Sequence, residues 1–162
     1  MISIRGLCKR LGTRNVLDGV DLDIQTGESV VVLGPSGTGK SVLLKHIIGL
    51  MRPDAGSIEI DGEQLVGLRE SEMNGIRRRF GMLFQGAALF DSMSVGENVA
   101  LALREHTDMS EPDIQRRVTE RLDWVGLKNI ETMRPSSLSG GMRKRVGLAR
   151  AVAMDPDRKS VV

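Results

Sequence analysis

The sequence predicts an α/β fold, and three observations support this. A β-branched run, Ser29–Leu33, is typical of a strand that is buried on both faces. This run leads directly into a glycine-rich loop, Gly34–Ser41, and residues 42–50 then have helical spacing. Strand patterns dominate the chain up to about residue 84, and helix patterns dominate the remainder. The 162 residues are enough for one domain of ordinary size.

Composition limits the classes of function. Aromatic residues make up 2% of the chain, which argues against nucleic-acid binding by base stacking, and the net charge of +2 comes from interleaved charges. The single cysteine, Cys8, excludes a disulfide framework and a cysteine-rich zinc site. The longest apolar run is too short to cross a membrane, and the N-terminus has no signal-peptide pattern. We therefore expect a cytosolic α/β enzyme or binding module without a nucleic-acid partner.

The individual strands follow from local patterns. Val20–Ile24 alternates apolar and polar residues after a turn signal at Asp18-Gly19, as a half-buried strand does. Ser57–Ile60 is followed by Asp61-Gly62, which together indicate a strand and a hairpin turn. Phe80–Phe84 is predicted to be another short strand.

Three helices are predicted in the second half. Ser94 and Glu97 form a capping box that begins a helix over Val95–His106. Ser110 precedes a second helix, which ends at Gly126. The segment Ser139-Gly140-Gly141 begins a third helix that runs to about Met154. One apolar stripe on the second helix is expected to be buried: Ile114, Val118, Leu122 and Val125.

The strongest motif is the loop Gly34-Pro35-Ser36-Gly37-Thr38-Gly39-Lys40-Ser41, which matches G-x-x-x-x-G-K-[ST] in full. Gly37 and Gly39 allow successive backbone N–H groups to point inward at a phosphate, and the following helix adds its N-terminal dipole. Lys40 supplies a positive charge for β- and γ-phosphates, and the Ser41 hydroxyl is placed to ligand Mg²⁺. The loop therefore predicts binding of ATP and Mg²⁺.

A second motif is Leu138-Ser139-Gly140-Gly141-Met142, another helix start suited to an anion. Taken alone, it is a plain serine N-cap with permissive glycines. Taken with Gly34–Ser41 and with Phe84-Gln85 between them, it resembles the signature of the ATP-binding cassette (ABC) ATPases. That signature is usually LSGGQ, and Met142 stands here in the glutamine position.

The resemblance covers residues 1–156 as a partial ABC ATPase domain. It implies a P-loop NTPase fold of the ABC ATPase type, with an antiparallel β subdomain and a helical subdomain at about residues 90–138. It also implies that Gln85 is the catalytic-site glutamine, which touches Mg²⁺ and senses the membrane partner. Ser139, Gly140 and Gly141 would hold the ATP bound to a second ATPase subunit in a head-to-tail homodimer. Leu11 stands near where many members stack an aromatic residue on adenine, so only a weak apolar contact with the base is expected.

A finer resemblance lies in Met82–Phe90 and Leu103–Thr107, which are similar to the ATPases of Mla/Mce-type phospholipid-trafficking systems. Met142 fits that group, in which LSGGM is common. The resemblance implies an integral membrane permease, Mce-domain and periplasmic lipid-binding proteins as partners, and a position on the cytoplasmic face of the inner membrane. Three alternatives remain open: the ATPase of an importer for another solute, a soluble ABC protein outside transport, and an inert nucleotide-binding fragment.

The end of the sequence departs from the family. After Asp155-Pro156 the family continues with an apolar strand that ends in Asp-Glu, the Walker B carboxylates, and no residue here replaces them. We therefore expect an incomplete sheet and an inactive chain. Residues 157–162 match a translation of GATCGGAAGAGCGTCGTG, a common short-read sequencing adapter, so they are interpreted as a non-native tail. A natural truncation with a basic tail is the alternative.

Overall fold

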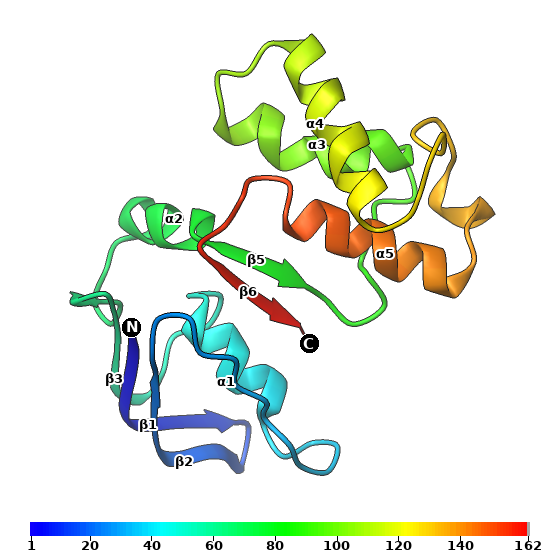
Figure 1. The fold of residues 1–162 in the computed structure, drawn as a ribbon. Coiled ribbons are helices and arrows are strands. Elements are labelled where there is room, and N and C mark those ends of the chain that lie inside the picture. The colour runs from blue at the N-terminus through cyan, green and yellow to red at the C-terminus, as the bar shows by residue number, and fades with distance from the viewer. Residues whose placement is uncertain (162) are drawn as a thin grey trace. The chain divides into compact units, whose positions relative to one another are not determined.

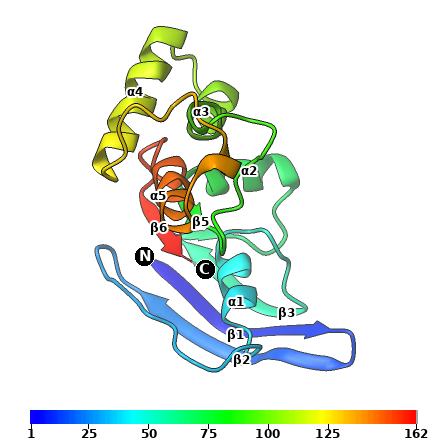
Figure 2. The same ribbon diagram turned by 90° about the vertical axis from the view of Figure 1, so that its right-hand side faces the viewer.

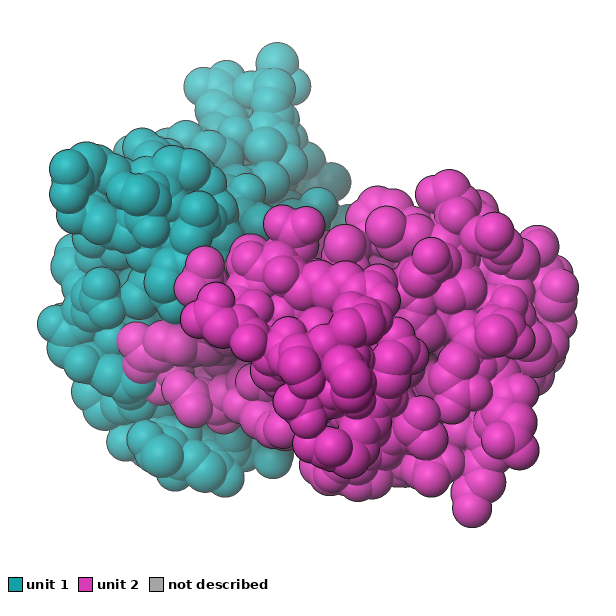
Figure 3. Space-filling view, turned by 90° about the horizontal axis from the view of Figure 1, so that it is seen from above, with its two compact units in different colours: residues 1–77 teal, residues 78–162 magenta. Residues whose placement is uncertain are grey.

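The computed structural model describes residues 1–161, with the side chain of residue 161 left aside, and divides the chain into two compact units. The first unit is Met1–Arg77 and the second is Arg78–Val162 (Figure 3). An α/β fold with an antiparallel sheet and a helical part is thereby confirmed. Among the helices of residues 1–161, none combines the length and the apolar character that a membrane span requires.

The first unit is built on a four-stranded antiparallel sheet in the order β2-β1-β3-β4. Two long strands, β1 (Ile2–Leu11) and β2 (Arg14–Ile24), form a hairpin, and β3 (Ala55–Ile60) pairs with the other edge of β1 (Figures 1 and 2). The short β4 (Glu63–Gln64) follows β3 through a turn in which Asp61 and Gly62 both have positive φ, as the sequence predicts.

The buried face of this sheet follows from strand register. Ile4 is fully buried and lies opposite Leu22 of β2 and Ile58 of β3. Side chains that are opposite one another on neighbouring strands pack directly, so this row forms the core of the sheet. The alternation predicted for Val20–Ile24 is confirmed, because its apolar residues are half-buried and its aspartates exposed. Asp18-Gly19 is not a turn, however: it lies within β2 where the register with β1 shifts at a bulge.

The strand predicted at Ser29–Leu33 is wrong. These residues have no regular secondary structure, and Val31 and Leu33 are 77% and 86% exposed. A β-branched run favours a strand only when neighbouring strands complete its hydrogen bonds and cover its side chains. Neither sheet formed by residues 1–161 includes this segment, so its strand propensity has no partner to act with.

Two helices accompany the sheet. α1 (Lys40–Ile47) follows the glycine-rich loop and ends before Gly49, in agreement with the helical spacing of the sequence. α2 (Glu70–Arg78) was not predicted by the sequence patterns. Its only buried residues are Met73 and Ile76, an apolar face too short to show a clear period.

The second unit combines three helices with a pair of parallel strands. α3 (Val95–His106), α4 (Glu111–Trp124) and α5 (Gly140–Ala151) surround a common core, and a 3₁₀ turn, η1 (Pro135–Ser137), precedes α5 (Figure 1). The predicted stripe on α4 is confirmed, since three of its members are buried and the fourth packs against them: Ile114, Val118, Leu122 and Val125.

The parallel pair consists of β5 (Phe80–Leu83), as predicted, and β6 (Arg158–Val161). The basic and polar sequence of residues 157–162 gives no strand pattern, yet Arg158–Val161 forms a strand. The hydrogen bonds between β5 and β6 join backbone groups. The unpaired N–H and C=O groups at the edge of β5 can pair with a neighbouring segment whatever side chains that segment carries.

The capping box of α3 provides a stability test. The Ser94 hydroxyl accepts from the Glu97 N–H at 3.2 Å, and the Glu97 carboxylate accepts from the Ser94 N–H at 2.6 Å. We expect Ser94→Ala to lower the free energy of unfolding by about 1 kcal/mol, the usual loss for an N-cap serine. Chemical denaturation measures this, with Ser92→Ala as control, because Ser92 is exposed and uses its carbonyl to accept from Arg134. Equal losses in the two variants would contradict the assignment.

Candidate functional site

The loop Gly34–Ser41 is shaped by its own polar contacts. The Lys40 ammonium donates to the carbonyl oxygens of Gly34 and Pro35, both at 2.8 Å, and the Thr38 hydroxyl donates to Pro35 O at 2.9 Å. The loop is thus drawn around the Lys40 side chain. Pro35–Thr38 and Ser41 are exposed, and Lys40 is half-buried. The ammonium is therefore held at the loop, where an incoming anion can exchange with the carbonyls.

Gly39 fixes this loop to the sheet. It is buried, its φ is 99°, and a Cβ atom at this position would lie 2.8 Å from Val16 O and 3.2 Å from Leu17 Cδ2. A side chain would therefore push α1 away from β2. Gly39 also begins α1, because its carbonyl accepts from the Leu43 N–H at 2.8 Å. Close approach of backbone to backbone is the reason that glycine stands here.

These residues fit a nucleotide phosphate and its magnesium ion. Gly39 brings no capping side chain to α1, so the first N–H groups of the helix can donate to an anion. Lys40 adds a full positive charge beside them. The exposed Ser41 hydroxyl is a hard oxygen ligand of the kind that Mg²⁺ prefers. When bound, ATP would supply the phosphoryl group, and Mg²⁺ would neutralise its developing charge.

Leu11 lies in the same unit as this loop. It pairs with Arg14 at the closed end of the β1–β2 hairpin and is 44% exposed. The same hairpin carries Val16, against which Gly39 packs. An exposed leucine at this end offers an adenine ring an apolar surface without an aromatic face.

The second motif is positioned as the sequence predicts. Ser139 is the N-cap of α5, and its hydroxyl accepts from the Met142 N–H at 3.2 Å. Gly140 and Gly141 are exposed, and among the described residues a Cβ on either would meet nothing closer than 3.9 Å. Packing within this chain therefore does not require glycine at these two positions. An unobstructed helix N-terminus of this kind suits close approach by a group from another molecule.

Gln85 is exposed in the turn that follows β5. The turn is closed by the Ala87 N–H, which donates to Phe84 O at 2.9 Å.

The predicted site residues are divided between the two units. The first unit contains Leu11 and Gly34–Ser41, and the second contains Gln85 and Ser139–Gly141. Sequence patterns missed Val16 and Arg150. Arg150 donates to the carbonyls of the Gln85 turn, and no local signal reveals such a tertiary contact.

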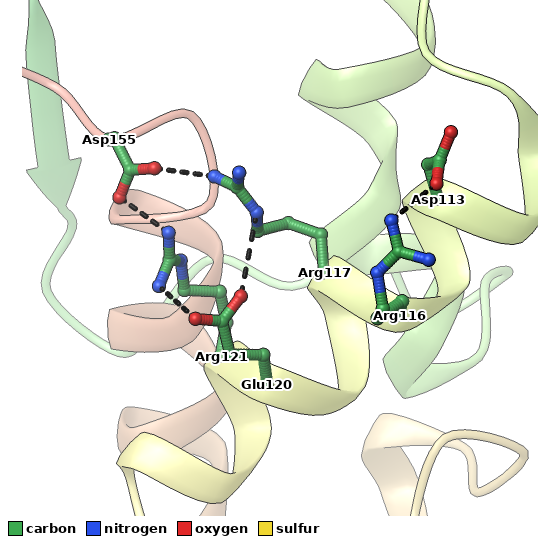
Figure 4. Close-up of polar contacts among 6 residues, drawn as sticks. All are labelled: Asp113, Arg116, Arg117, Glu120, Arg121 and Asp155. Atoms are coloured by element: carbon green, nitrogen blue, oxygen red, sulfur yellow. Dashed lines mark hydrogen bonds and ion pairs between the residues drawn. The ribbon is translucent and has the colours of Figure 1, made fainter.

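The two aspartates near the end of the chain have structural partners. Asp155 accepts from Arg117 and from Arg121, each at 2.5 Å, and Glu120 pairs with the same arginines (Figure 4). Asp157 lies 3.7 Å from Arg79. Arg121 is almost fully buried and stacks on the exposed Trp124 ring at 3.7 Å. These contacts tie α4 to the segment after α5 and give Asp155 a structural role instead of a catalytic one.

The segment Leu103–Thr107 ends α3 and joins it to α4. The Arg104 guanidinium donates to Glu111 at the start of α4, and this contact lowers the pKa of Glu111 to about 2, with Gln115 as the second donor. Thr107 caps α3, since its hydroxyl donates to Leu103 O at 2.6 Å. This segment therefore acts structurally within the helical part.

Comparison with known proteins gives the family directly. The family model described as ABC transporter matches residues 17–158. A protein of Mycobacterium leprae named probable ribonucleotide transport ATP-binding protein mkl is 51% identical over 155 residues, which are 96% of this chain and 45% of that protein. The Escherichia coli intermembrane phospholipid transport system ATP-binding protein MlaF is 41% identical over 157 residues, 97% of this chain and 58% of that protein.

Solved structures agree. The dimeric bacterial ABC transporter cassette MJ0796 is 34% identical, with a TM-score of 0.92, covering 99% of this chain and 73% of that one. A dimer of the same cassette in a post-hydrolysis state, bound to ADP and Pi, gives a TM-score of 0.92 at 33% identity, with the same coverage. The chain spans about half the length of the curated relatives it matches. These likenesses agree with the loop Gly34–Ser41 and the Ser139 cap, and they show that the chain belongs to the ABC transporter family of ATP-binding proteins.

Proposed function

We propose that this chain is the nucleotide-binding part of an ATPase subunit that drives an ABC transporter for phospholipid. The observation that carries the proposal is the Gly34–Ser41 loop, which Gly39 fixes against β2 with Lys40 at its centre. Lys40 and the first N–H groups of α1 would hold the β- and γ-phosphates, and Leu11 would contact adenine. Ser41 and Gln85 would ligand Mg²⁺ through oxygen atoms.

A second copy of the subunit would complete the site. Ser139, Gly140 and Gly141 would face the γ-phosphate on the partner's Gly34–Ser41 loop in a head-to-tail homodimer. The open space around both glycines supports this, because the residues that the structure describes do not fill it. Both MJ0796 structures are named as dimers, which favours the same arrangement.

The transported substrate is proposed from the relatives. MlaF is named for intermembrane phospholipid transport, and the segments Met82–Phe90 and Leu103–Thr107 resemble that group. The partners would be a membrane permease, Mce-domain proteins and periplasmic lipid-binding proteins, with the ATPase on the cytoplasmic side. The protein mkl is named for ribonucleotide transport, which supports a second candidate. A neighbouring gene for an Mce-domain protein beside a permease gene favours lipid, and a solute-binding protein gene in its place favours the second.

ATP turnover is the part of the proposal that residues 1–162 do not complete. In this sequence no apolar strand ending in Asp-Glu follows Pro156, and we assign the carboxylate that would polarise the attacking water to no residue of it. We expect the chain alone to release no phosphate above background. A cassette extended to the length of its relatives should hydrolyse ATP. Steady phosphate release by the chain alone, abolished by Lys40→Ala, would contradict this expectation.

A further inference from the structure

The turn that follows Gln85 has an unusual backbone. Gly86, Ala87 and Ala88 have φ angles of 73°, 68° and 45°. A left-handed backbone is unfavourable for residues that carry a Cβ atom, and it persists only when surrounding contacts hold it. Two alanines in succession therefore require support from outside the turn.

Helix α5 supplies that support at two points. The Arg150 guanidinium donates from Nη2 to Ala87 O at 2.7 Å and from Nη1 to Ala88 O at 2.8 Å. One turn earlier on the same helix face, a Cβ at Gly147 would lie 2.8 Å from Ala87 Cβ and 2.8 Å from Leu83 Cδ1. Ala87 is fully buried against this glycine. We refer to Gly147 and Arg150 together as the α5 clamp.

The chemistry of the clamp favours arginine. A planar guanidinium presents two N–H groups in fixed directions and so reaches two successive carbonyl oxygens, whereas a lysine ammonium acts as a single point charge. Burial lowers the pKa of the Arg150 guanidinium from its usual value. Because the guanidinium is planar and preorganised, Arg150 loses little side-chain conformational entropy when it donates to both carbonyls.

We propose that Arg150 is a positioning residue for Gln85: it holds the Gly86–Ala88 turn in its left-handed conformation and thereby sets where the Gln85 side chain is presented. The inference rests on the proposed role of Gln85 as an oxygen ligand of Mg²⁺. Because α5 begins at Ser139 and carries the clamp near its other end, one helix would connect the partner subunit's nucleotide to the Gln85 turn.

The first arm of the test is amide hydrogen exchange on the chain itself. Arg150→Ala should speed exchange of the Ala87 N–H about tenfold or more relative to the amides of α3, because two charge-assisted hydrogen bonds are lost. Arg150→Lys, which has less risk of misfolding, should lie between. Arg145→Ala is the matched control: Arg145 is on the same helix and also donates to two successive carbonyls, those of Val125 and Gly126. Unchanged exchange at Ala87 in both Arg150 variants would overturn the proposal.

The second arm asks whether Arg150 acts through Gln85. ATP affinity is measured against Mg²⁺ concentration for Arg150→Lys, Gln85→Ala and the double variant. If Arg150 positions Gln85, the single variant Arg150→Lys should weaken the dependence of ATP affinity on Mg²⁺. In the double variant, Arg150→Lys should change ATP affinity by less than about twofold relative to Gln85→Ala. If the effects of the two single variants multiply in the double variant, the proposal is overturned. If Gln85→Ala leaves the Mg²⁺ dependence unchanged, the proposed role of Gln85 is wrong, and the exchange arm still decides whether Arg150 holds the turn.

Discussion

Replacing Lys40 with alanine is expected to weaken binding of Mg²⁺-ATP by about 100-fold or more. The ammonium is held within the loop by two carbonyl oxygens, and we expect it to transfer to the β- and γ-phosphates when nucleotide binds. A charge-assisted hydrogen bond contributes roughly 1.5–3 kcal/mol, and 1.4 kcal/mol corresponds to a factor of ten in affinity. Removing the only cation of the Gly34–Ser41 loop therefore weakens nucleotide binding itself.

Calorimetric titration of the chain with Mg²⁺-ATP measures this loss. Lys45→Ala is the matched control, because Lys45 lies in the last turn of the same helix, away from the loop. It should bind nucleotide as the parent chain does. Equal affinity of the Lys40→Ala variant and the parent chain would show that the loop does not hold the phosphates.

Ser139→Arg is expected to separate binding from assembly. In the proposed dimer Ser139 serves the partner's nucleotide, so the variant subunit should bind ATP within about twofold of the parent. ATP-driven dimerisation and hydrolysis should be abolished, because a bulky cation replaces a small cap and opposes the helix dipole at the N-terminus of α5. The measurement is sedimentation and phosphate release in a cassette extended to the length of its relatives.

Ser136→Arg is the control for Ser139→Arg. Ser136 is an exposed residue of η1, only a few residues before the cap, so it receives the same charge outside the signature. It should dimerise with ATP. If Ser139→Arg lost monomer binding as fully as Lys40→Ala, both motifs would act on one nucleotide within one chain, and the head-to-tail arrangement would be wrong.

Helix boundaries could be predicted from the sequence because their signals are local. Ser94, Ser110 and Ser139 each accept a hydrogen bond from an N–H three residues later, as their positions before apolar stripes predict. The same holds for Gly126, whose φ of 69° ends the turn after α4. Such signals need no knowledge of the rest of the chain.

Strands could be predicted less well because they depend on partners. Ser29–Leu33 has strong strand propensity and forms no strand, whereas the polar Arg158–Val161 pairs with β5. Propensity describes side chains, but a ladder is made by backbone groups of a neighbouring segment. The sequence alone does not reveal which segment becomes that neighbour.

The candidate site shows the same division. The motif pattern singled out the loop Gly34–Ser41, and the structure adds the reason for Gly39, namely its approach to Val16 O. The Arg150 contacts join residues far apart in the chain, so their geometry appears only in three dimensions. Local motifs and helix caps were therefore predictable, and the tertiary contacts around them were not.

The most direct test of a nucleotide site shared between two subunits mixes Lys40→Ala and Ser139→Arg subunits of the extended cassette. In a mixed dimer, one nucleotide lies between the intact loop of the Ser139→Arg subunit and the intact Ser139 of the Lys40→Ala subunit. If the site is shared between subunits, the mixture should form an ATP-dependent dimer holding a single tightly bound nucleotide, although neither variant dimerises alone. A mixture that dimerises no better than its separate components, while parent subunits assembled in parallel do dimerise, would contradict the shared site.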